Sequence, residues 1–398
     1  MINKIKTLKE VELKDKLVLL RVDINSPVNN KKLIDNPRLK EAAETIKYIV
    51  NKKAKLVIIA HQGRKGDADF IDLRQHAELL SKYSGKKIEY IDGLFEDSAL
   101  ERIDQLEMGE ALIMKNVREY EDEKELRGSR FYGFADLFDL YVNDAFSVCH
   151  RNQGSIVIPP EEIESCAGLN LEKEINVLSK FDLDKNEKAV YIVGGKKIED
   201  YMPILNVLTN KNAKIIASGV LANLFLVAKG LDLGYENKWL KEKDYMRFIP
   251  KLKDIYNKHK EQIILPVDFA IDGKERKEIS LKDLPNDKKI WDVGHESVSL
   301  FIKEIEKAKI VFMKGPVGYS EIEKFSYGTV EALKCISKLT ADKQIFSLLG
   351  GGHLSTSIQE YKIPNHFSHI STSGGALISY ISGETLPGVQ ALEKSVGK

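Results

Sequence analysis

The sequence has few of the features that mark secreted, membrane-spanning or nucleic-acid-binding proteins. It has three cysteines, Cys149, Cys166 and Cys335, without CxxC spacing, which suits a reducing compartment better than a disulfide framework. It has no uncharged apolar stretch of about 18 residues, and residues 1–16 lack the apolar core of a signal peptide. Its 61 Lys and Arg against 60 Asp and Glu leave a net charge of +1 and no strong field for nucleic acid. We therefore expect a soluble, cytoplasmic protein with no nucleic-acid or membrane partner.

The length and the alternation of apolar patterns predict the fold class. A chain of 398 residues favours two domains, and a hydrophobic content of 43% is enough to bury both cores. Short apolar runs predict strands at residues 17–22, 55–60, 111–115, 140–145, 189–193, 214–217, 262–267, 290–293, 310–313, 345–348 and 367–371. Amphipathic segments predict helices at residues 73–83, 129–138, 171–180, 221–229, 297–307, 327–339 and 354–360. Strands this apolar are covered on both faces, so we expect an α/β fold of two doubly wound, Rossmann-like lobes with mainly parallel sheets.

The division between the lobes is expected at residues 159–171. Pro159 and Pro160 are interpreted as stopping a strand, and a long amphipathic helix follows at residues 171–181. This predicts an N-terminal lobe of residues 1–168 and a C-terminal lobe of residues 169–370, joined by a hinge helix. Residues 371–398 are expected to return to the first lobe.

Four apolar runs in the second half end in glycine-rich or basic clusters before a helix-like segment begins. They are YIVGG before Lys196 and Lys197, KIIASG ending at Gly219, VFMKGPVG ending at Gly318, and SLLGGG ending at Gly352. Each junction presents backbone N–H groups and the positive end of a helix dipole, which attract phosphate.

In the first half, five segments that end strands or begin helices carry anion-binding side chains. They are Arg21, Asp23 and Asn25 in RVDINSP, Arg38 after Asn36-Pro37, His61 and Arg64 in HQGR, Arg118 in NVR, and Arg151 after YVNDAF. Their recurrence at one sheet edge predicts a pocket whose forked guanidinium groups hold a small ligand with both a carboxylate and a phosphate. Cys149 beside His150 is given a structural role, because adjacent residues on a strand point to opposite faces.

These motifs resemble, in order, those of phosphoglycerate kinase. RVDINSP, HQGR, YVNDAF with HR, VGGKK, LPVDF, KGPVGYSE, LLGGGH and ISTSGGA cover residues 17 to about 395, and short loops near residues 66–75 and 120–130 look like archaeal members. The resemblance implies reversible phosphoryl transfer between 1,3-bisphosphoglycerate and ADP, giving 3-phosphoglycerate and ATP in glycolysis and gluconeogenesis. It implies hinge closure and in-line transfer. The acceptor carboxylate is already ionised near neutral pH, so positioning and charge neutralisation suffice without a general base.

The resemblance also implies a role for each motif residue. The 3-phosphoglycerate site would contain Arg21, Asp23, Asn25, Arg38, His61, Arg64, Arg118 and Arg151. The nucleotide site would contain Gly194, Gly195, Lys197, Gly219, Pro316, Gly318, Glu321, Gly350, Gly351, Gly352 and His353, with Glu321 on the ribose. Arg38, Lys197, Gly352 and Gly374 would act on the transferring phosphoryl group, and Ser373 and Gly375 would add backbone donors.

Four positions depart from the family pattern. His353 stands where an Asp usually contacts the magnesium of the nucleotide, Tyr201 stands where many members have a second lysine, Lys314 replaces an Asn, and Ser373 replaces a Gly. Because imidazole is a poor ligand for Mg²⁺, we expect the ion to be held with the ATP or ADP by phosphate oxygens and water, with no metal ligand from the protein. His353 could instead donate a hydrogen bond to a phosphate oxygen. Lys196 is a weak candidate for the missing cation, since neighbouring side chains diverge.

Two other interpretations remain open from the sequence. A catalytically weak relative that binds phosphorylated metabolites would explain His353 and Tyr201, although the retained Arg38 and Lys197 disfavour it. A nicotinamide-dependent dehydrogenase lacks support because no GxGxxG follows the strands. A monomer is expected, with a homodimer as the alternative.

Overall fold

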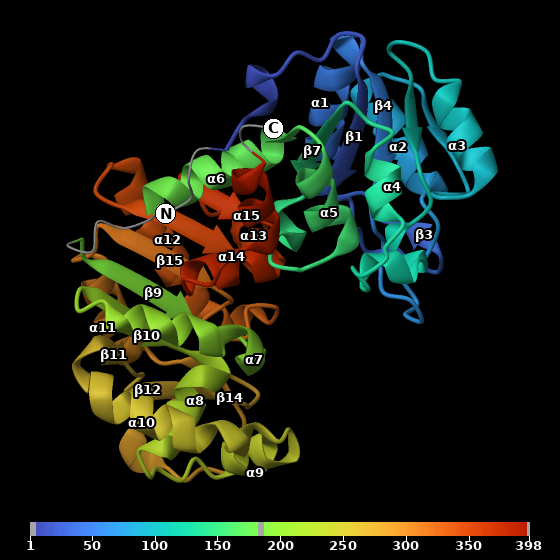
Figure 1. Ribbon diagram of the computed structural model, residues 1–398. Helices are drawn as coiled ribbons and strands as arrows, with labels where there is room; N and C mark the ends of the chain where they lie inside the picture. The colour runs from blue at the N-terminus through green and yellow to red at the C-terminus, as the bar shows by residue number, and fades with distance from the viewer. Residues whose placement is uncertain (1–4, 182–186, 396–398) are drawn as a thin grey trace. The chain divides into compact units, whose positions relative to one another are not determined.

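The computed structural model describes residues 5–181 and 187–395, which belong to two compact units (Figure 1). Unit 1 comprises Met1–Ser179 with Thr385–Lys398, and unit 2 comprises Lys180–Glu384. Each unit contains a six-stranded parallel sheet with helices on its faces, so the predicted mixed α/β fold is confirmed. No helix of the described residues is long and apolar enough to cross a membrane.

In the parallel sheet of unit 1, the order in which the strands are added changes direction near the centre. Its order is β5-β6-β4-β1-β7-β8. The strands are β1 (Leu17–Val22), β4 (Lys55–Ile59), β5 (Ile88–Tyr90), β6 (Ala111–Ile113), β7 (Leu140–Asp144) and β8 (Ser165–Ala167), with a separate hairpin of β2 (Val28–Asn29) and β3 (Lys32–Leu33). The chain leaves β1 toward β4 on one side and leaves β7 toward β8 on the other. The carboxyl ends of β1 and β7 therefore form a topological switch point, where open α/β sheets bind ligands.

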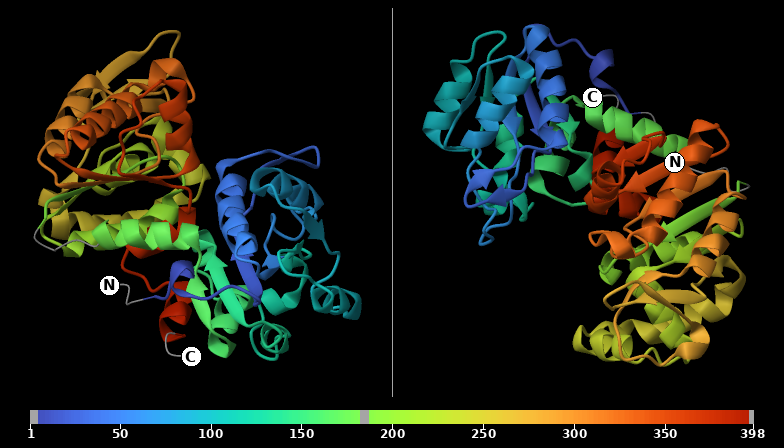
Figure 2. Two further views of the ribbon diagram at one scale, coloured as in Figure 1. Left: turned by 90° about the horizontal axis from the view of Figure 1, so that it is seen from above. Right: turned by 180° about the vertical axis from the view of Figure 1, so that it is seen from behind.

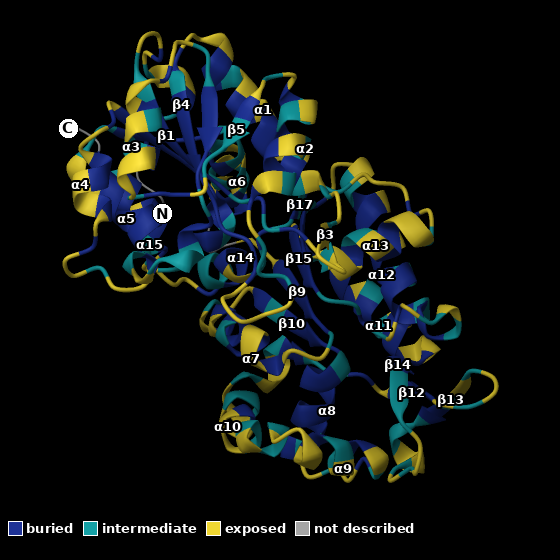
Figure 3. Cartoon of the chain, turned by 90° about the vertical axis from the view of Figure 1, so that its right-hand side faces the viewer, coloured by how far each residue is buried: buried dark blue, intermediate teal, exposed yellow. Residues whose placement is uncertain are grey.

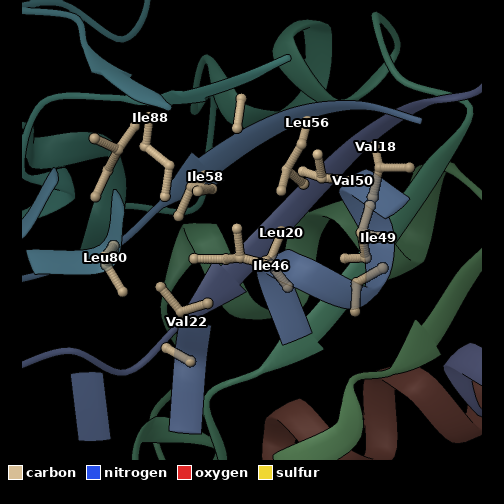
Figure 4. Close-up of a cluster of buried hydrophobic side chains, with 14 of the residues drawn as sticks. Val18, Leu20, Val22, Ile46, Ile49, Val50, Leu56, Ile58, Leu80 and Ile88 are labelled. Carbon is tan, nitrogen blue, oxygen red and sulfur yellow. The ribbon is translucent and has the colours of Figure 1, made fainter. Parts of the chain in front are cut away.

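Apolar side chains on both faces of this sheet hold the helices. They are α1 (Pro37–Asn51) and α2 (Arg74–Ser84) on one face, and α3 (Asp97–Asp104), α4 (Phe131–Ala135), α5 (Gly154–Glu162) and α15 (Pro387–Lys394) on the other. Figure 4 shows the first layer, formed by Val18, Leu20, Val22, Ile46, Ile49, Val50, Leu56, Ile58, Leu80 and Ile88. Alternate residues of β1 point to this layer, as the two-residue period of a strand requires. These two buried layers hold the strands in place, and so they also position the polar side chains at the strand ends.

The sheet of unit 2 repeats this arrangement. Its order is β11-β10-β9-β15-β16-β17, and a smaller antiparallel sheet has the order β13-β12-β14. The strands are β9 (Ala189–Val193), β10 (Ala213–Ala217), β11 (Ile263–Ile264), β12 (Asp268–Ile271), β13 (Lys277–Ser280), β14 (Ile290–Val293), β15 (Ile310–Lys314), β16 (Phe346–Gly350) and β17 (His369–Ser371). The chain leaves β9 toward β10 and leaves β15 toward β16, so the switch point of unit 2 lies at β9 and β15.

The helices of unit 2 differ in burial according to their sequence pattern. They are α7 (Ile198–Tyr201), α8 (Gly219–Ala228), α9 (Tyr235–Glu242), α10 (Ile249–His259), α11 (His295–Ile305), α12 (Tyr327–Ala341), α13 (Gly352–Glu360) and α14 (Gly374–Ile381). Helices α11, α12 and α13 cover one face of the main sheet (Figure 2). Helix α8 is apolar except for Asn223 and is buried along nearly its whole length, whereas α9 and α10 carry exposed residues (Figure 3). A helix with so few polar residues must be covered on every side.

Helix α6 (Leu169–Phe181) runs from unit 1 to the first residues of unit 2. Its start is held in unit 1 by Asp144, whose Oδ1 accepts hydrogen bonds from the backbone N–H groups of Asn170 at 2.7 Å and Leu171 at 3.1 Å. The returning C-terminal segment is held there by Gly388, whose N–H donates to the Cys149 carbonyl at 2.9 Å. The units consequently divide after Ser179 and after Glu384, later than the expected boundaries at 168 and 370. Residues 374–381 form α14, which packs on α7 in unit 2.

Two local predictions are wrong. Residues 154–162 form helix α5, although Pro159 and Pro160 were interpreted as ending a strand. The helix tolerates Pro159 because the Ser155 carbonyl, which Pro159 cannot bond, accepts from the hydroxyl of Tyr141 at 2.8 Å. The strand predicted at residues 262–267 shortens to β11, since Pro266 has no N–H to donate to a ladder.

Candidate active site

Each unit gathers predicted site residues at the carboxyl edge of its own sheet. In unit 1, Asp23 and Asn25 follow β1, His61 follows β4, and Arg151 follows the short helix after β7. Arg38 lies in the first turn of α1, which Asn36 caps by accepting from the Arg38 backbone N–H at 3.0 Å. In unit 2, the glycine-rich loops follow β9, β10, β15 and β16. Parallel strands bring these chain-distant residues to one edge in each unit.

Unit 1 contains a group of four arginines and one histidine, here called the basic cluster, formed by Arg38, His61, Arg64, Arg118 and Arg151. Burial, together with the charges of Arg21, Arg151 and Arg64, lowers the pKa of Arg118 to about 10. Burial likewise lowers the pKa of Arg151, again with a contribution from Arg64. Cations that depress one another's pKa are close together and short of negative charge. A bound anion would relieve this repulsion.

The carboxylate of Asp23 and the amide of Asn25 organise the loops around the basic cluster. Asp23 Oδ2 lies 2.9 Å from Arg38 Nη1 and accepts a hydrogen bond from Ser147, so it orients the Arg38 side chain. Asn25 Oδ1 accepts from the Gly63 N–H at 2.8 Å, which joins the loop after β1 to the HQGR loop. Gly63 has a φ of +64°, and an added Cβ would lie 2.6 Å from the Asp69 carbonyl oxygen, so only glycine fits there.

Arg21, predicted as a ligand-binding residue, is fully buried, with 0% of its side chain exposed. Its guanidinium donates to Ser155 Oγ at 3.0 Å, to the Val22 carbonyl at 2.6 Å and to His61 Nδ1 at 3.0 Å. Glu123 Oε1 lies 3.9 Å away and is also buried. Each of the three Arg21 nitrogens therefore donates a hydrogen bond within the protein. Arg21 therefore positions His61 rather than presenting its own charge to a ligand.

The contact with Arg21 determines which nitrogen of His61 carries the proton. Burial lowers the pKa of His61 well below its usual value, and the charges of Arg21, Arg118, Arg151 and Arg38 add to this. The ring is therefore neutral near pH 7. Because Arg21 donates to Nδ1, the single proton resides on Nε2, which makes His61 a neutral hydrogen-bond donor.

Two arginines of the basic cluster keep donor groups available. Arg151 has a buried Nε with no hydrogen-bond partner among the described residues. Arg64 is exposed at the end of the HQGR loop. Arg118 donates one Nη1 bond to the Gly63 carbonyl, which fixes its direction. An unsatisfied buried donor costs free energy, so Arg151 is suited to binding a carboxylate or phosphate oxygen.

In unit 2, four glycines let the loops after β9, β10 and β15 approach closely. An added Cβ on Gly194 would lie 2.1 Å from the Pro316 carbonyl oxygen, and one on Gly219 would lie 2.8 Å from the Gly195 backbone nitrogen. Gly195, Gly219 and Gly315 also have positive φ values of +89°, +53° and +77°. Side chains at these positions would separate the loops. The backbone is thereby left open to a ligand at the switch point.

The loop after β16 leads into helix α13 and forms the second part of this edge. Gly351 has a φ of +113° and precedes Gly352, the first residue of the helix. Backbone N–H groups at such a helix start are donors for an anion. Lys197, at the start of α7, is exposed, as is Lys196. Ser373 has a φ of −87°, so the serine there carries no left-handed strain, and Gly374 at +41° begins α14.

Glu321 and His353, two residues predicted for the nucleotide site, contact each other. Glu321 Oε1 lies 3.1 Å from His353 Nδ1, and both side chains are exposed. Gly318 and Val317 donate their backbone N–H groups to Thr329 Oγ1 at 3.2 and 3.0 Å, which anchors the loop that also contains Pro316. Glu321 and His353 are therefore adjacent in the structure.

No group of three or more His, Cys, Asp or Glu that could hold a metal ion occurs within residues 5–181 and 187–395. The pair of Glu321 and His353 offers one carboxylate and one imidazole, and imidazole is a poor ligand for Mg²⁺.

Some residues of the site were not found by sequence reasoning. Gln62 is fully buried and braces two loops, accepting from the Ser26 N–H at 2.8 Å and donating to the Asp69 carbonyl at 3.0 Å. The one signal for Gln62 in the sequence is that the HQGR motif follows a buried strand, which favours burial of its first residues. Cys149 lies at the end of a short 3₁₀ helix rather than on a strand, and burial raises its pKa to about 12, so it is not a nucleophile.

The fold and these edges define a class of protein. Two parallel α/β sheets, one with a basic cluster and one with glycine-lined loops at its switch point, are typical of a phosphotransferase with separate places for an anionic acceptor and a nucleotide. The sequence profile of the family described as "Phosphoglycerate kinase" matches residues 8–384. The chain belongs to the phosphoglycerate kinase family.

Individual relatives agree with this assignment. The chain is 36% identical over 402 residues to a phosphoglycerate kinase of Methanothermus fervidus, covering 98% of this chain and 97% of the relative. It is 37% identical over 406 residues to one of Archaeoglobus fulgidus, covering 99% and 98%. The crystal structure of phosphoglycerate kinase from Pyrococcus horikoshii matches with a TM-score of 0.87 and 35% identity, covering 98% of this chain and 99% of that one. The resemblance to archaeal members is thus confirmed.

Proposed function

We propose that this chain is an active phosphoglycerate kinase that transfers a phosphoryl group between 1,3-bisphosphoglycerate and ADP to give 3-phosphoglycerate and ATP. The observation that supports this is the basic cluster of unit 1, in which the buried Arg151 Nε has no hydrogen-bond partner among the described residues and His61 is a neutral Nε2 donor. A triose carrying a carboxylate and a phosphate offers the oxygens that such donors need. The family of the chain supplies the reaction class.

On the acceptor side, Arg64, Arg118, Arg151 and His61 would hold the phosphate and orient the glycerate. Arg38 lies at the start of α1 and is oriented by Asp23, at 2.9 Å, so it would face the carboxylate that is phosphorylated. That carboxylate is ionised near pH 7 and needs no general base. The contribution of unit 1 is then orientation and charge neutralisation.

On the nucleotide side, the loops of Gly194, Gly195 and Gly219 would let the nucleotide approach the backbone. The start of α13 at Gly352 would donate N–H groups to its phosphates, and Lys197 would neutralise charge on the transferring group. Pro316 and Gly318 would border the adenosine, with Glu321 on the ribose. Mg²⁺ would arrive bound to ATP or ADP and offset phosphate charge, held by phosphate oxygens and water rather than by His353. We propose that closure of one unit on the other allows in-line transfer.

A steady-state assay tests this proposal. ATP and 3-phosphoglycerate are supplied with Mg²⁺, and formation of 1,3-bisphosphoglycerate is followed by coupling to its reduction. We expect turnover in the usual kinase range of about 1–100 s⁻¹. The Arg38→Ala variant should lose about 10²-fold or more in kcat while keeping its ATP affinity, since Arg38 lies on unit 1.

Arg74→Ala is the matched control, because Arg74 is an exposed arginine of unit 1 paired with Asp72 and Asp92. It should retain the parent kcat. Binding of both substrates without turnover by the parent chain would favour the alternative of a catalytically weak relative. An unchanged kcat in Arg38→Ala would refute the role given to Arg38.

The remaining attributes are proposed from composition. We propose that the enzyme acts in the cytoplasm, since the three cysteines are unpaired thiols, and that it is a monomer. Light scattering during size-exclusion chromatography tests the monomer, and a mass near 90 kDa instead of about 45 kDa would contradict it.

A further inference from the structure

Lys314 stands at the centre of the switch point of unit 2. As the last residue of β15, it lies in register with Val193 of β9 on one side and Gly350 of β16 on the other. Its carbonyl accepts from the Gly194 N–H at 2.9 Å. Its side chain runs along the other loop, because an added Cβ on Gly351 would lie 3.2 Å from Lys314 Nζ. The ammonium group therefore lies beside the start of α13.

The Lys314 side chain is largely buried, and no carboxylate of the described residues forms an ion pair with it. Lys314 is only 9% exposed, and its ammonium group makes no hydrogen bond within the described part of the chain. Burial lowers its pKa, Lys197 lowers it further, and Asp200 raises it. A buried charge is unfavourable unless it is paired. The charge at Lys314 is thus available for an anion that the described residues do not supply.

Tyr201 occupies the neighbouring place without supplying charge. It follows Lys197 by four residues, one helical turn, and is 7% exposed. An added Cβ on Gly195 or Gly315 would lie 3.0 or 3.1 Å from its hydroxyl oxygen, so the ring fills the space between the two loops. Burial raises its pKa to about 12, which keeps the phenol neutral. The family pattern has a lysine at this position and an asparagine at that of Lys314.

We propose that Lys314 is a phosphate-binding residue of the nucleotide site, whose ammonium group contacts the terminal phosphates of ATP or ADP and replaces the cation absent at Tyr201. Two independent features support this: the unpartnered lysine and the N–H groups of the adjacent helix start meet at one place. An oxygen of a polyphosphate can accept from both. The inference rests on the proposed function, because it assigns a contact within that nucleotide site.

The first test removes the charge while keeping the length of the side chain. Lys314→Met should fold, since it replaces a buried ammonium by an apolar group of similar shape. Isothermal titration with ATP and with adenosine then separates phosphate binding from base and ribose binding. We expect the Kd for ATP to rise about 10–100-fold, the value of one charged hydrogen bond, and the Kd for adenosine to stay unchanged. The Kd for 3-phosphoglycerate, whose site lies in unit 1, should also stay unchanged.

Lys196→Met is the matched control, because Lys196 is an exposed lysine beside the same loop. It should alter the ATP affinity less than twofold. An equal loss in this variant would show that only the general field of unit 2 matters, and it would overturn the assignment. ATP affinity equal to that of the parent in Lys314→Met, or equal losses for ATP and adenosine, would also overturn it.

A second test moves the cation from position 314 to position 201 and measures whether ATP binding is recovered. Tyr201→Lys combined with Lys314→Asn returns a cation to the turn after Lys197, and we expect it to bind ATP at least tenfold more tightly than Lys314→Asn alone. Failure of this rescue would contradict a shared role. If the parent chain binds no ATP, the proposed function fails. If the parent binds and turns over ATP but Lys314→Met is unchanged, only this inference fails.

Discussion

Replacing Arg21 by Met should destabilise unit 1 and expose the cost of its buried charges. The guanidinium lies 3.9 Å from Glu123 and donates to Ser155 and His61, and both charged side chains are buried. Removing one partner of a buried ion pair costs about 3–5 kcal/mol, because the other charge stays uncompensated. With a urea m-value of about 2 kcal/mol/M, the midpoint of unit 1 should fall by about 1.5–2.5 M.

The chain offers an internal control for this measurement. Both tryptophans, Trp239 and Trp291, lie in unit 2, so fluorescence follows unit 2 while far-UV circular dichroism follows both units. We expect the dichroism transition of Arg21→Met to split and the fluorescence midpoint to remain. Arg21→Met with Glu123→Gln removes both charges and should recover most of the loss, since a buried pair replaced together is nearly neutral.

The loss should also depend on pH in a defined direction. Burial raises the pKa of Glu123, and the charge of Arg21 opposes this rise. A carboxyl whose pKa is raised on folding contributes stability below its unfolded pKa and loses it as pH rises through the folded pKa. Without Arg21 the folded pKa rises further, so Arg21→Met should be less damaging at pH 5 than at pH 8. A variant as stable as the parent at pH 8, or a double variant no better than the single one, would refute the reasoning.

Three further predictions concern the site. Gly194→Ala places a Cβ 2.1 Å from the Pro316 carbonyl oxygen and should cost about 3 kcal/mol or more in unit 2, measured by tryptophan fluorescence in urea, whereas Gly133→Ala in unit 1, whose Cβ meets nothing within 4 Å, should lose no stability by far-UV circular dichroism. Arg151→Lys keeps the charge but loses the fork and should raise the Kd for 3-phosphoglycerate about tenfold by calorimetry, and an unchanged Kd would contradict a direct contact. Excess chelator should abolish phosphoryl transfer in the coupled assay and restored Mg²⁺ should recover it, whereas full activity in chelator would refute magnesium as part of the nucleotide substrate.

Local sequence patterns were sufficient for the elements with strong signals. The glycine-rich ends of β9, β10, β15 and β16 could be found because a tight loop needs glycine wherever it lies. The Asn36-Pro37 start of α1 was visible because capping involves only neighbouring residues. Helix α5 was missed because its tolerance of Pro159 depends on Tyr141, a residue of a different element.

The sequence by itself determined which residues meet at each sheet edge, because parallel strands bring their carboxyl ends together regardless of the details of packing. Only the tertiary structure decided which of those residues can face a ligand. Arg21 is turned inward by Ser155, which is 134 residues away in the chain, and Lys314 is enclosed by loops that follow other strands. Burial and partner choice are properties of contacts between distant segments, so no local pattern contains them.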